Sequence, residues 1–282
     1  RAAADGDGRA AEEGLVLWSA AVWASEAAGA APPPVPRALA AAKRKEEAVL
    51  AFVRQNAAQG DLDAVLRAIE RFGRERAWLK VAGGGKARLL AGCLRPGDRV
   101  RELGAYVGYS ALLTVRQLRR LGGGGAVVSC EVDAGNALVA RAVIAWAGAE
   151  EEARVRVGRA CDWLAGERLG PLDLLVLDHR GTVYHQDLHT AEAALAPGAR
   201  ALADNVLLPG APLFLSFLEG RYDFAVHDVP EFERPELEDW VVVCSPRREA
   251  LAASPRRAPR EFRRLSAEID AVSWRSMRAA VD

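Results

Sequence analysis

The spacing of apolar residues predicts alternating helices and strands along the middle of the chain. Residues 45–59 and 61–74 carry apolar side chains three and four positions apart, which predicts two helices, the second with Asp61 as its N-cap. A third helix is expected near Lys86, after a run of three glycines. Shorter runs then alternate between β-type and helical patterns. The expected strands are 99–103, 126–131, 154–157, 172–178 and 199–204, and the helices between them lie near 110–121, 135–148, 160–166, 186–195 and 211–219.

Strands that are joined by helices form right-handed crossovers, so these elements predict a mostly parallel sheet with helices on both faces. Two later runs, 222–229 and 240–244, have no long helix between them, which indicates an antiparallel hairpin at the end of the sheet. The predicted fold class is therefore α/β, a doubly wound sheet of seven strands. Ligands of such sheets bind at the carboxyl ends of the strands.

Composition changes at both ends of this domain, which is expected to span residues 43–245. Residues 1–42 form an Ala/Pro-rich extension that is expected to be partly ordered and ends in a proline-rich linker. Its apolar stretch, 14–25, is interpreted as a docked helix or as the remnant of an anchor or targeting segment. Residues 246–282 are rich in Arg and Pro, and their apolar residues fall at helical spacing. The tail is therefore expected to end in an amphipathic helix that packs on the core or on a second subunit.

Charge and cysteine content exclude several classes of function. The 282-residue chain has 38 basic and 38 acidic residues, and this balance argues against nucleic acid as a partner. An RNA methyltransferase that used the basic tail would be the exception, and it would bind RNA in a salt-sensitive manner. The cysteines lie far apart, which argues against a zinc cluster or a disulfide framework and favours a cytoplasmic location. Only four basic residues are lysines: Lys43, Lys45, Lys80 and Lys86.

The turn after the first predicted strand carries the first candidate chemistry. Gly104 and Gly108 follow Glu102, and two glycines in such a turn let the backbone pass close to a ligand. The spacing is not that of a dinucleotide fingerprint, and the acid suits a zwitterionic or cationic ligand. Glu131 ends the next strand, where a carboxylate can accept hydrogen bonds from both ribose hydroxyls. Together these residues favour a nucleoside cofactor over the alternative of a tight turn alone.

Three oxygen-bearing side chains follow the fourth and fifth predicted strands. Asp178 follows one strand, and Asp204 and Asn205 end the other. Because the ends of nearby parallel strands converge, these groups are expected at one rim, where two carboxylates and an amide oxygen suit Mg²⁺. The alternative is that Asp178 caps a turn and the other two merely end a strand.

At these residues the chain resembles the catechol O-methyltransferase family, whose members use S-adenosylmethionine and magnesium. The resemblance runs from about residue 46 to 220 through the blocks RELGAYVGYSA, DLLVLDHRGTVYHQD and ALADNVLLPGAPLFLSFL. It implies a Rossmann-like methyltransferase fold and a set of cofactor-binding residues. These residues are Val81, Glu102, Gly104, Tyr106, Ser110, Glu131, Val132, Ala160, Asp178 and His179, with Ala160 standing where the family usually has a serine.

The resemblance also implies an in-line methyl transfer from the sulfonium to a catecholate oxygen. Asp178, Asp204 and Asn205 match the magnesium ligands, and the metal would chelate both oxygens of the acceptor. Asp178 and Glu233 are the expected catalytic residues, with Glu231 as the alternative to Glu233. The expected substrate-binding residues are Asn205, Pro209 and Glu233, with Leu208 beside them in the apolar wall.

The chain departs from the family where the general base, a lysine, is expected. Gly181 stands at that position, and the preceding Arg180 is a poor base at ordinary pH. Three explanations compete. Metal-bound substrate loses its proton to water, another group such as His179, His185 or Lys80 serves, or the chain is an S-adenosylmethionine-binding homologue that is non-catalytic or has another acceptor. The complete set of metal ligands favours an active enzyme. The expected partner is a small catechol-like molecule, the chain is expected to be a monomer or weak dimer, and membrane association is left open.

Overall fold

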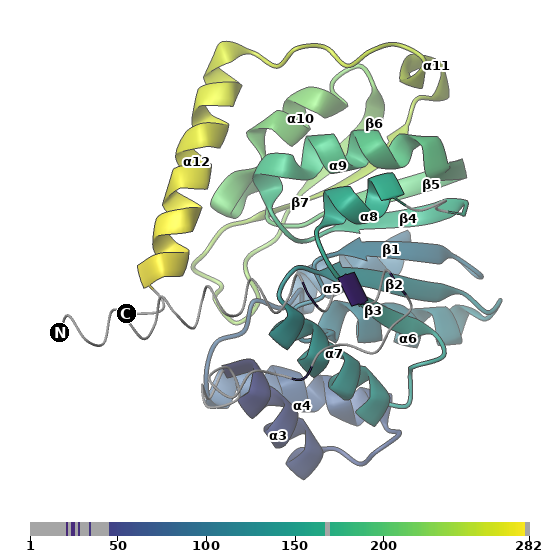
Figure 1. Ribbon diagram of the computed structural model, residues 1–282, viewed down its shortest axis with the longest axis vertical. Coiled ribbons are helices and arrows are strands. Elements are labelled where there is room, and N and C mark those ends of the chain that lie inside the picture. The colour runs from purple at the N-terminus through teal and green to yellow at the C-terminus, as the bar shows by residue number, and fades with distance from the viewer. Residues whose placement is uncertain are drawn as a thin grey trace.

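The computed structural model describes residues 45–166 and 170–279, together with the isolated positions 21, 24, 25, 28 and 34. Its centre is a seven-stranded sheet in the order β3-β2-β1-β4-β5-β7-β6 (Figure 1). The first five strands are parallel, and β7 runs antiparallel to both β5 and β6. The strands are β1 (Arg99–Leu103), β2 (Ala126–Glu131), β3 (Ala153–Val157), β4 (Leu172–Leu177), β5 (Leu195–Ala203), β6 (Tyr222–Asp228) and β7 (Trp240–Pro246).

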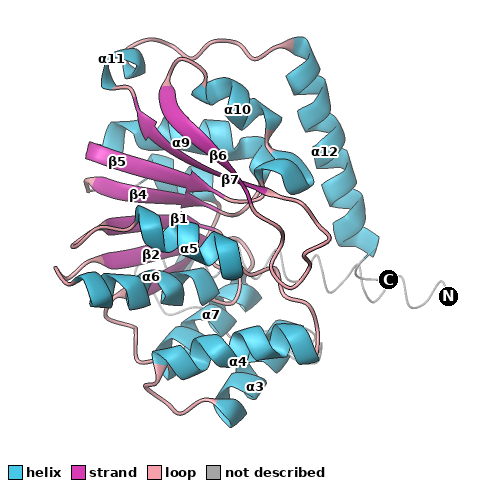
Figure 2. Cartoon of the chain, turned by 180° about the vertical axis from the view of Figure 1, so that it is seen from behind, coloured by secondary structure: helices cyan, strands magenta, loops and turns pink. Residues whose placement is uncertain are grey.

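Helices cover both faces of the sheet. On one face lie α8, α9 and α10, and on the other lie α5, α6 and α7 (Figures 1 and 2). Helices α3 and α4 form a further layer that packs on α7 and α6, respectively. These helices are α3 (Lys45–Asn56), α4 (Leu62–Glu75), α5 (Gly84–Cys93), α6 (Tyr109–Leu121), α7 (Ala134–Trp146), α8 (Ala160–Gly166), α9 (Tyr184–Ala191) and α10 (Pro212–Leu218).

The sandwich has one apolar core on each face of the sheet. The larger core contains Leu112 of α6 and Val143 of α7, and the smaller one contains Tyr184 of α9 and Phe214 of α10. Sheet strands that are buried on both faces read as continuous apolar runs, as β4 does with LDLLVL. These runs position the carboxyl ends of the parallel strands, where the candidate site lies.

The predicted elements and the doubly wound fold are confirmed, with small differences at the ends of elements. Asp61 caps α4 as expected, since its carboxylate accepts the Ala64 backbone N–H at 2.8 Å. The helix expected over 186–195 is shorter, because α9 ends at Ala191 and the 3₁₀ turn η2 (Glu192–Ala194) follows. Strand β5 then begins four residues earlier than expected, since Leu195 pairs with Leu172 before an irregularity in the ladder. Two more short turns, η1 (Gly181–Val183) and η3 (Val206–Gly210), follow the ends of β4 and β5.

The tail after β7 forms α11 (Arg248–Leu251) and α12 (Arg260–Ala279). Helix α12 packs on α10, η1 and η3, on the side toward which the parallel strands point (Figure 2). Ser266 and Ile269 face the domain, whereas Leu265 and Val272 are exposed. The amphipathic helix therefore forms, but its inner face is shifted from the one that the apolar spacing predicted.

Among the described residues, no helix is long and apolar enough to cross a membrane. The expectations for residues 1–42, including the docked helix at 14–25, fall almost wholly outside the described residues.

Candidate active site

The loop between β1 and α6 passes against the end of β4. Gly104 has a φ of 101°, and a Cβ atom there would collide with the backbone carbonyl oxygen of Asp178. Gly108, at φ 84°, begins the turn into α6. Both positions need a conformation that glycine adopts without strain, so this sequence brings the backbone of the loop close to the carboxyl end of β4.

Glu102 presents a buried carboxylate to this loop. Its Oε2 accepts a hydrogen bond from the Ser129 hydroxyl, and Ser110 also bonds to the carboxylate. Its Oε1 is buried and has no hydrogen-bond partner among the described residues. Burial raises the pKa of Glu102 above its ordinary value. Because buried oxygens are normally paired, the free Oε1 suits a cationic group such as the ammonium of an amino acid.

Glu131 lies at the end of β2 and holds the same loop. Its two oxygens accept the backbone N–H groups of Tyr106 and Asp133, each at 2.9 Å. Burial is the largest cause of a raised pKa, which lies at about 7. The neighbouring Val132 is exposed, and a carboxylate oxygen can accept a second bond, so this corner fits a ribose with an adenine beside it.

His179, directly after Asp178, is held by a buried acid. Its Nε2 lies 2.8 Å from Oδ2 of Asp187, and its ring packs on Tyr184 with centroids 5.1 Å apart. If Nε2 carries the proton and donates it to Asp187, Nδ1 keeps a lone pair. Within the described chain, this buried Nδ1 has no hydrogen-bond partner. In that tautomer the lone pair of Nδ1 is unused.

The rim beside β4 and β5 contains a lysine surrounded by acids. The Nζ of Lys86 lies 2.8 Å from Asp204 Oδ1, 2.6 Å from Glu231 Oε2 and 2.7 Å from Asp239 Oδ2. We call Asp204, Glu231 and Asp239 the carboxylate cluster. All four side chains are buried, and that of Lys86 is 2 % exposed. Burial lowers the pKa of Lys86, but Asp204 and the three hydrogen bonds outweigh it and raise the pKa, so the side chain is an ammonium ion.

The residues expected to bind magnesium include Asp204 of this cluster, and Asn205 is hydrogen-bonded to another of its members. Asp204 Oδ1 contacts Lys86 and accepts the Asn205 backbone N–H, while Asn205 Nδ2 donates to Asp239 Oδ2 at 2.8 Å. Asp178 is half-buried nearby, and loss of solvation followed by the charge of Asp204 raises its pKa well above the ordinary value. Over residues 45–166 and 170–279, no group of three His, Cys, Asp or Glu side chains could hold a metal ion. The oxygen donors suit Mg²⁺ chemically, but an ion bound there would share Asp204 with the ammonium of Lys86.

The two glutamates proposed for the late loop occupy different surroundings. Glu231 is buried in the carboxylate cluster. Glu233 instead pairs with Arg74 of α4 at 3.0 Å, and its side chain is about a quarter exposed. The structure therefore brings Glu231, and not Glu233, next to Asp204.

The remaining predicted residues lie before or at the start of helices, or in η3. Val81 is buried just before α5, and Ala160 begins α8. Pro209 lies in η3 after a cis peptide bond with Leu208, whose side chain is partly exposed. Lys80, one of the possible bases, is exposed at the surface.

Gly181, where the family has its lysine, is closed to any side chain. A Cβ atom there would lie 2.7 Å from the carbonyl oxygen of Gly210. The adjacent Arg180 and Thr182 both bond to Asp270 of α12. The departure from the family is therefore part of the local packing, since η1 and η3 touch where a lysine would stand.

Sequence reasoning missed two members of the cluster, Lys86 and Asp239. Asp239 directly precedes β7, and it also accepts the backbone N–H groups of Leu208 and Trp240. The scarcity of lysine was the available signal for Lys86, because it is the last lysine in a chain rich in arginine.

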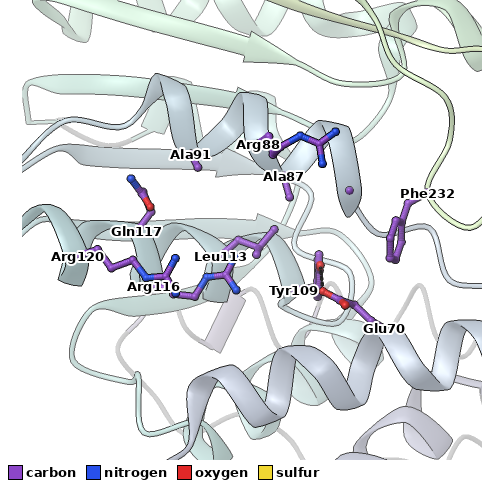
Figure 3. A pocket seen from close by; sticks show the side chains of 11 residues that line it. Glu70, Ala87, Arg88, Ala91, Tyr109, Leu113, Arg116, Gln117, Arg120 and Phe232 are labelled. Carbon is purple, nitrogen blue, oxygen red and sulfur yellow. Dashed lines mark hydrogen bonds between the residues drawn. The ribbon is translucent and has the colours of Figure 1, made fainter.

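A separate pocket of about 400 Å³ opens between α5 and α6 (Figure 3). Arg88, Arg116 and Arg120 line it, and Tyr109 closes one end with its hydroxyl bonded to Glu70 at 2.7 Å. The cationic lining distinguishes this pocket from the acidic rim at the strand ends.

Comparison with known proteins agrees with this arrangement. Residues 101–206 match a family described as a methyltransferase domain. The chain is 37% identical over 189 residues to catechol O-methyltransferase B of Danio rerio, covering 64% of this chain and 70% of the relative. It is 35% identical over 211 residues to the transmembrane O-methyltransferase of Homo sapiens, covering 70% of this chain and 71% of the relative.

Two solved structures share the fold. One is an O-methyltransferase from Bacillus cereus in complex with SAH, with a TM-score of 0.56 and 21% identity over 71% of this chain and 97% of that one. The other is the O-methyltransferase TomG from Streptomyces achromogenes in complex with SAM, with a TM-score of 0.54 and 21% identity over 72% of this chain and 99% of that one.

The curated relatives are O-methyltransferases and the fold is that of the two cofactor-bound structures, so the chain is an S-adenosylmethionine-dependent O-methyltransferase. At the identity and coverage found with its curated relatives, the chain belongs to the catechol O-methyltransferase family.

Proposed function

We propose that this chain transfers the methyl group of S-adenosylmethionine to a hydroxyl of a catechol-type small molecule. The observation that carries the proposal is the buried carboxylate of Glu102, which stands at the end of β1 just before the glycine loop and whose Oε1 has no partner in the described structure. Family membership supports the same reaction class.

The cofactor would span the carboxyl ends of β1 and β2. Glu102 would pair with the ammonium of its methionine part, and the glycine loop would contact the backbone of that part. Glu131 would accept the ribose hydroxyls beside the exposed Val132. When bound, S-adenosylmethionine supplies an electrophilic methyl group on its sulfonium.

The acceptor hydroxyl needs a group to position it and a group to take its proton. Glu231 is better placed than Glu233 for the first role, because it lies buried beside Asp204. For the second role we favour His179, whose orientation is fixed by Asp187. His185 also has a buried Nδ1 with no partner in the described structure, but burial lowers its pKa, so it is a weaker base than an exposed imidazole. Lys86 cannot accept a proton while it is an ammonium bound to three carboxylates.

The expected function also includes a magnesium ion. Asp178, Asp204 and Asn205 would hold the ion in the arrangement that the family resemblance implies. Because the ammonium of Lys86 already contacts Asp204, the proposed transfer does not depend on a bound metal ion. The catechol class of the acceptor is likewise proposed from the family and not from a shaped cavity.

The competing function is cofactor binding without methylation, or with a different acceptor. The closed position at Gly181 favours this alternative, since the lysine base of the family cannot be accommodated there. It predicts affinity for S-adenosylmethionine without turnover of catechols.

The test is a mass-spectrometric screen of catechol acceptors with the full chain and S-adenosylmethionine. We expect methylated product from the parent and a larger loss of kcat in Glu231→Gln than in Glu233→Gln. The reverse order would return the role to Glu233. Binding of the cofactor without any product would establish the competing function.

We also propose the partner, the assembly and the location of the chain. The partner is a small molecule and not nucleic acid, in a chain that is a monomer or weak dimer. The unpaired cysteines fit a cytoplasmic location.

A further inference from the structure

The carboxylate cluster is built around a cation that the chain itself supplies. An ammonium has three N–H donors, and Lys86 uses them on three different carboxylates at 2.6–2.8 Å. The residues come from three parts of the chain. Lys86 belongs to α5, Asp204 follows β5, and Glu231 and Asp239 belong to the segment between β6 and β7. A buried charge of either sign is costly alone, so these four side chains depend on one another.

The local sequence allows α5 to approach closely enough for this contact. A Cβ atom at Gly83 would lie 2.5 Å from the ring of Phe232, and one at Gly85 would lie 2.5 Å from Val229 Cγ1. The glycine run therefore lets the start of α5 pack against the segment that carries Glu231. Helix α5 therefore places the ammonium of Lys86 against that segment.

A divalent cation would have to share Asp204 with this ammonium. A metal ion and an ammonium that share one carboxylate in a buried site repel each other strongly, because screening by water is weak there. The amide nitrogen of Asn205 also donates to Asp239, which ties the orientation of that side chain to the same cluster.

We propose that the Lys86 side chain replaces a divalent metal ion at this rim and makes the site independent of metal. Lys86 neutralises the carboxylate cluster and holds Glu231 in place, so it acts as a positioning residue for the acceptor hydroxyl. This last role rests on the proposed methyl transfer, whereas the exclusion of metal does not.

The experiment measures metal binding directly. The full chain, saturated with S-adenosylhomocysteine, is titrated with MgCl₂ and with MnCl₂ by calorimetry, and its melting temperature is followed with and without each salt. The test variant is Lys86→Met, which keeps an unbranched apolar stem but removes the charged end. The matched control is Arg88→Met, which removes an exposed cation from the same helix.

We expect no saturable metal binding to the parent or to Arg88→Met. Lys86→Met should gain affinity for the metal by about a hundredfold or more, and its melting temperature should rise when the salt is added. If Lys86→Met does not fold, the double variant Lys86→Met with Asp239→Asn carries less unpaired charge and takes its place. Stoichiometric metal binding by the parent would overturn the proposal, and so would a variant that gains no affinity.

Activity separates this proposal from the methyl transfer. Methylation that persists in a chelator supports both. Methylation that is lost in the chelator and restored by MgCl₂ would overturn the metal-independent site while upholding the transfer. If no acceptor is methylated, the calorimetry still decides whether Lys86 excludes the metal.

Discussion

Replacing Glu102 by Gln tests the cofactor site while changing little of its shape. The side chain is fully buried at the end of β1, and hydroxyl groups of Ser110 and Ser129 bond to it. Glutamine keeps the size and can still accept a hydrogen bond, but it cannot pair with an ammonium. We therefore expect weaker cofactor binding without loss of the fold.

The magnitude follows from the bond that is lost. A hydrogen bond to a charged group contributes about 1.5–3 kcal/mol, which corresponds to about a 10- to 150-fold weaker Kd for S-adenosylmethionine. The same substitution should make the free protein more stable than the parent at high pH. Burial raises the pKa of Glu102, so the parent loses stability as pH rises through that folded-state pKa, whereas the Gln variant does not.

The assay is calorimetric titration with S-adenosylmethionine, combined with thermal melts of the free protein at several pH values. Glu75→Gln is the matched control, because Glu75 is an exposed acid on α4 whose ion pair with Arg71 is long, at 3.7 Å. An unchanged Kd for Glu102→Gln would show that this carboxylate does not face the cofactor, and the assignment of the site would fail.

Three further predictions concern the rim and the tail. Because burial raises the pKa of Glu131 to about 7 and the ribose prefers the carboxylate, cofactor affinity should increase as pH rises through about 7, and a titration series with Glu131→Gln should show no such step. Gly181→Lys should lower the melting temperature and give no higher turnover than the parent, since a Cβ there meets Gly210; increased turnover at neutral pH would refute this. Asp270→Ala removes the partner of Arg180 and should cost at most about 1 kcal/mol, because both side chains are partly exposed, while amide exchange in α12 becomes faster; unchanged exchange would count against the contact.

The fold could be predicted from the sequence because its strands are short, apolar and separated by helical periodicity. The burial pattern of β4 and the cap at Asp61 depend on neighbouring residues only, so they can be predicted from the local sequence. The start of β5 was misplaced because Leu195 enters the sheet through an irregular ladder with Leu172, which no local pattern encodes.

Only the site residues that directly follow or end a strand could be placed from the sequence. Asp178 and Asp204 could be placed at one rim because parallel strands end together. The contact between Lys86 and Asp239 joins residues 153 positions apart, and it depends on how closely α5 approaches the last loop. The choice between Glu231 and Glu233 depends on the conformation of that loop, where Glu233 has a φ of 60° and turns toward Arg74.

The most direct test of the proposed function is the mass of a catechol incubated with the full chain and S-adenosylmethionine in buffer that contains a chelator. The predicted result is a methylated catechol together with S-adenosylhomocysteine, and a much smaller yield from Glu102→Gln. A chain that binds the cofactor but leaves every catechol unmethylated, with or without added MgCl₂, would contradict the account.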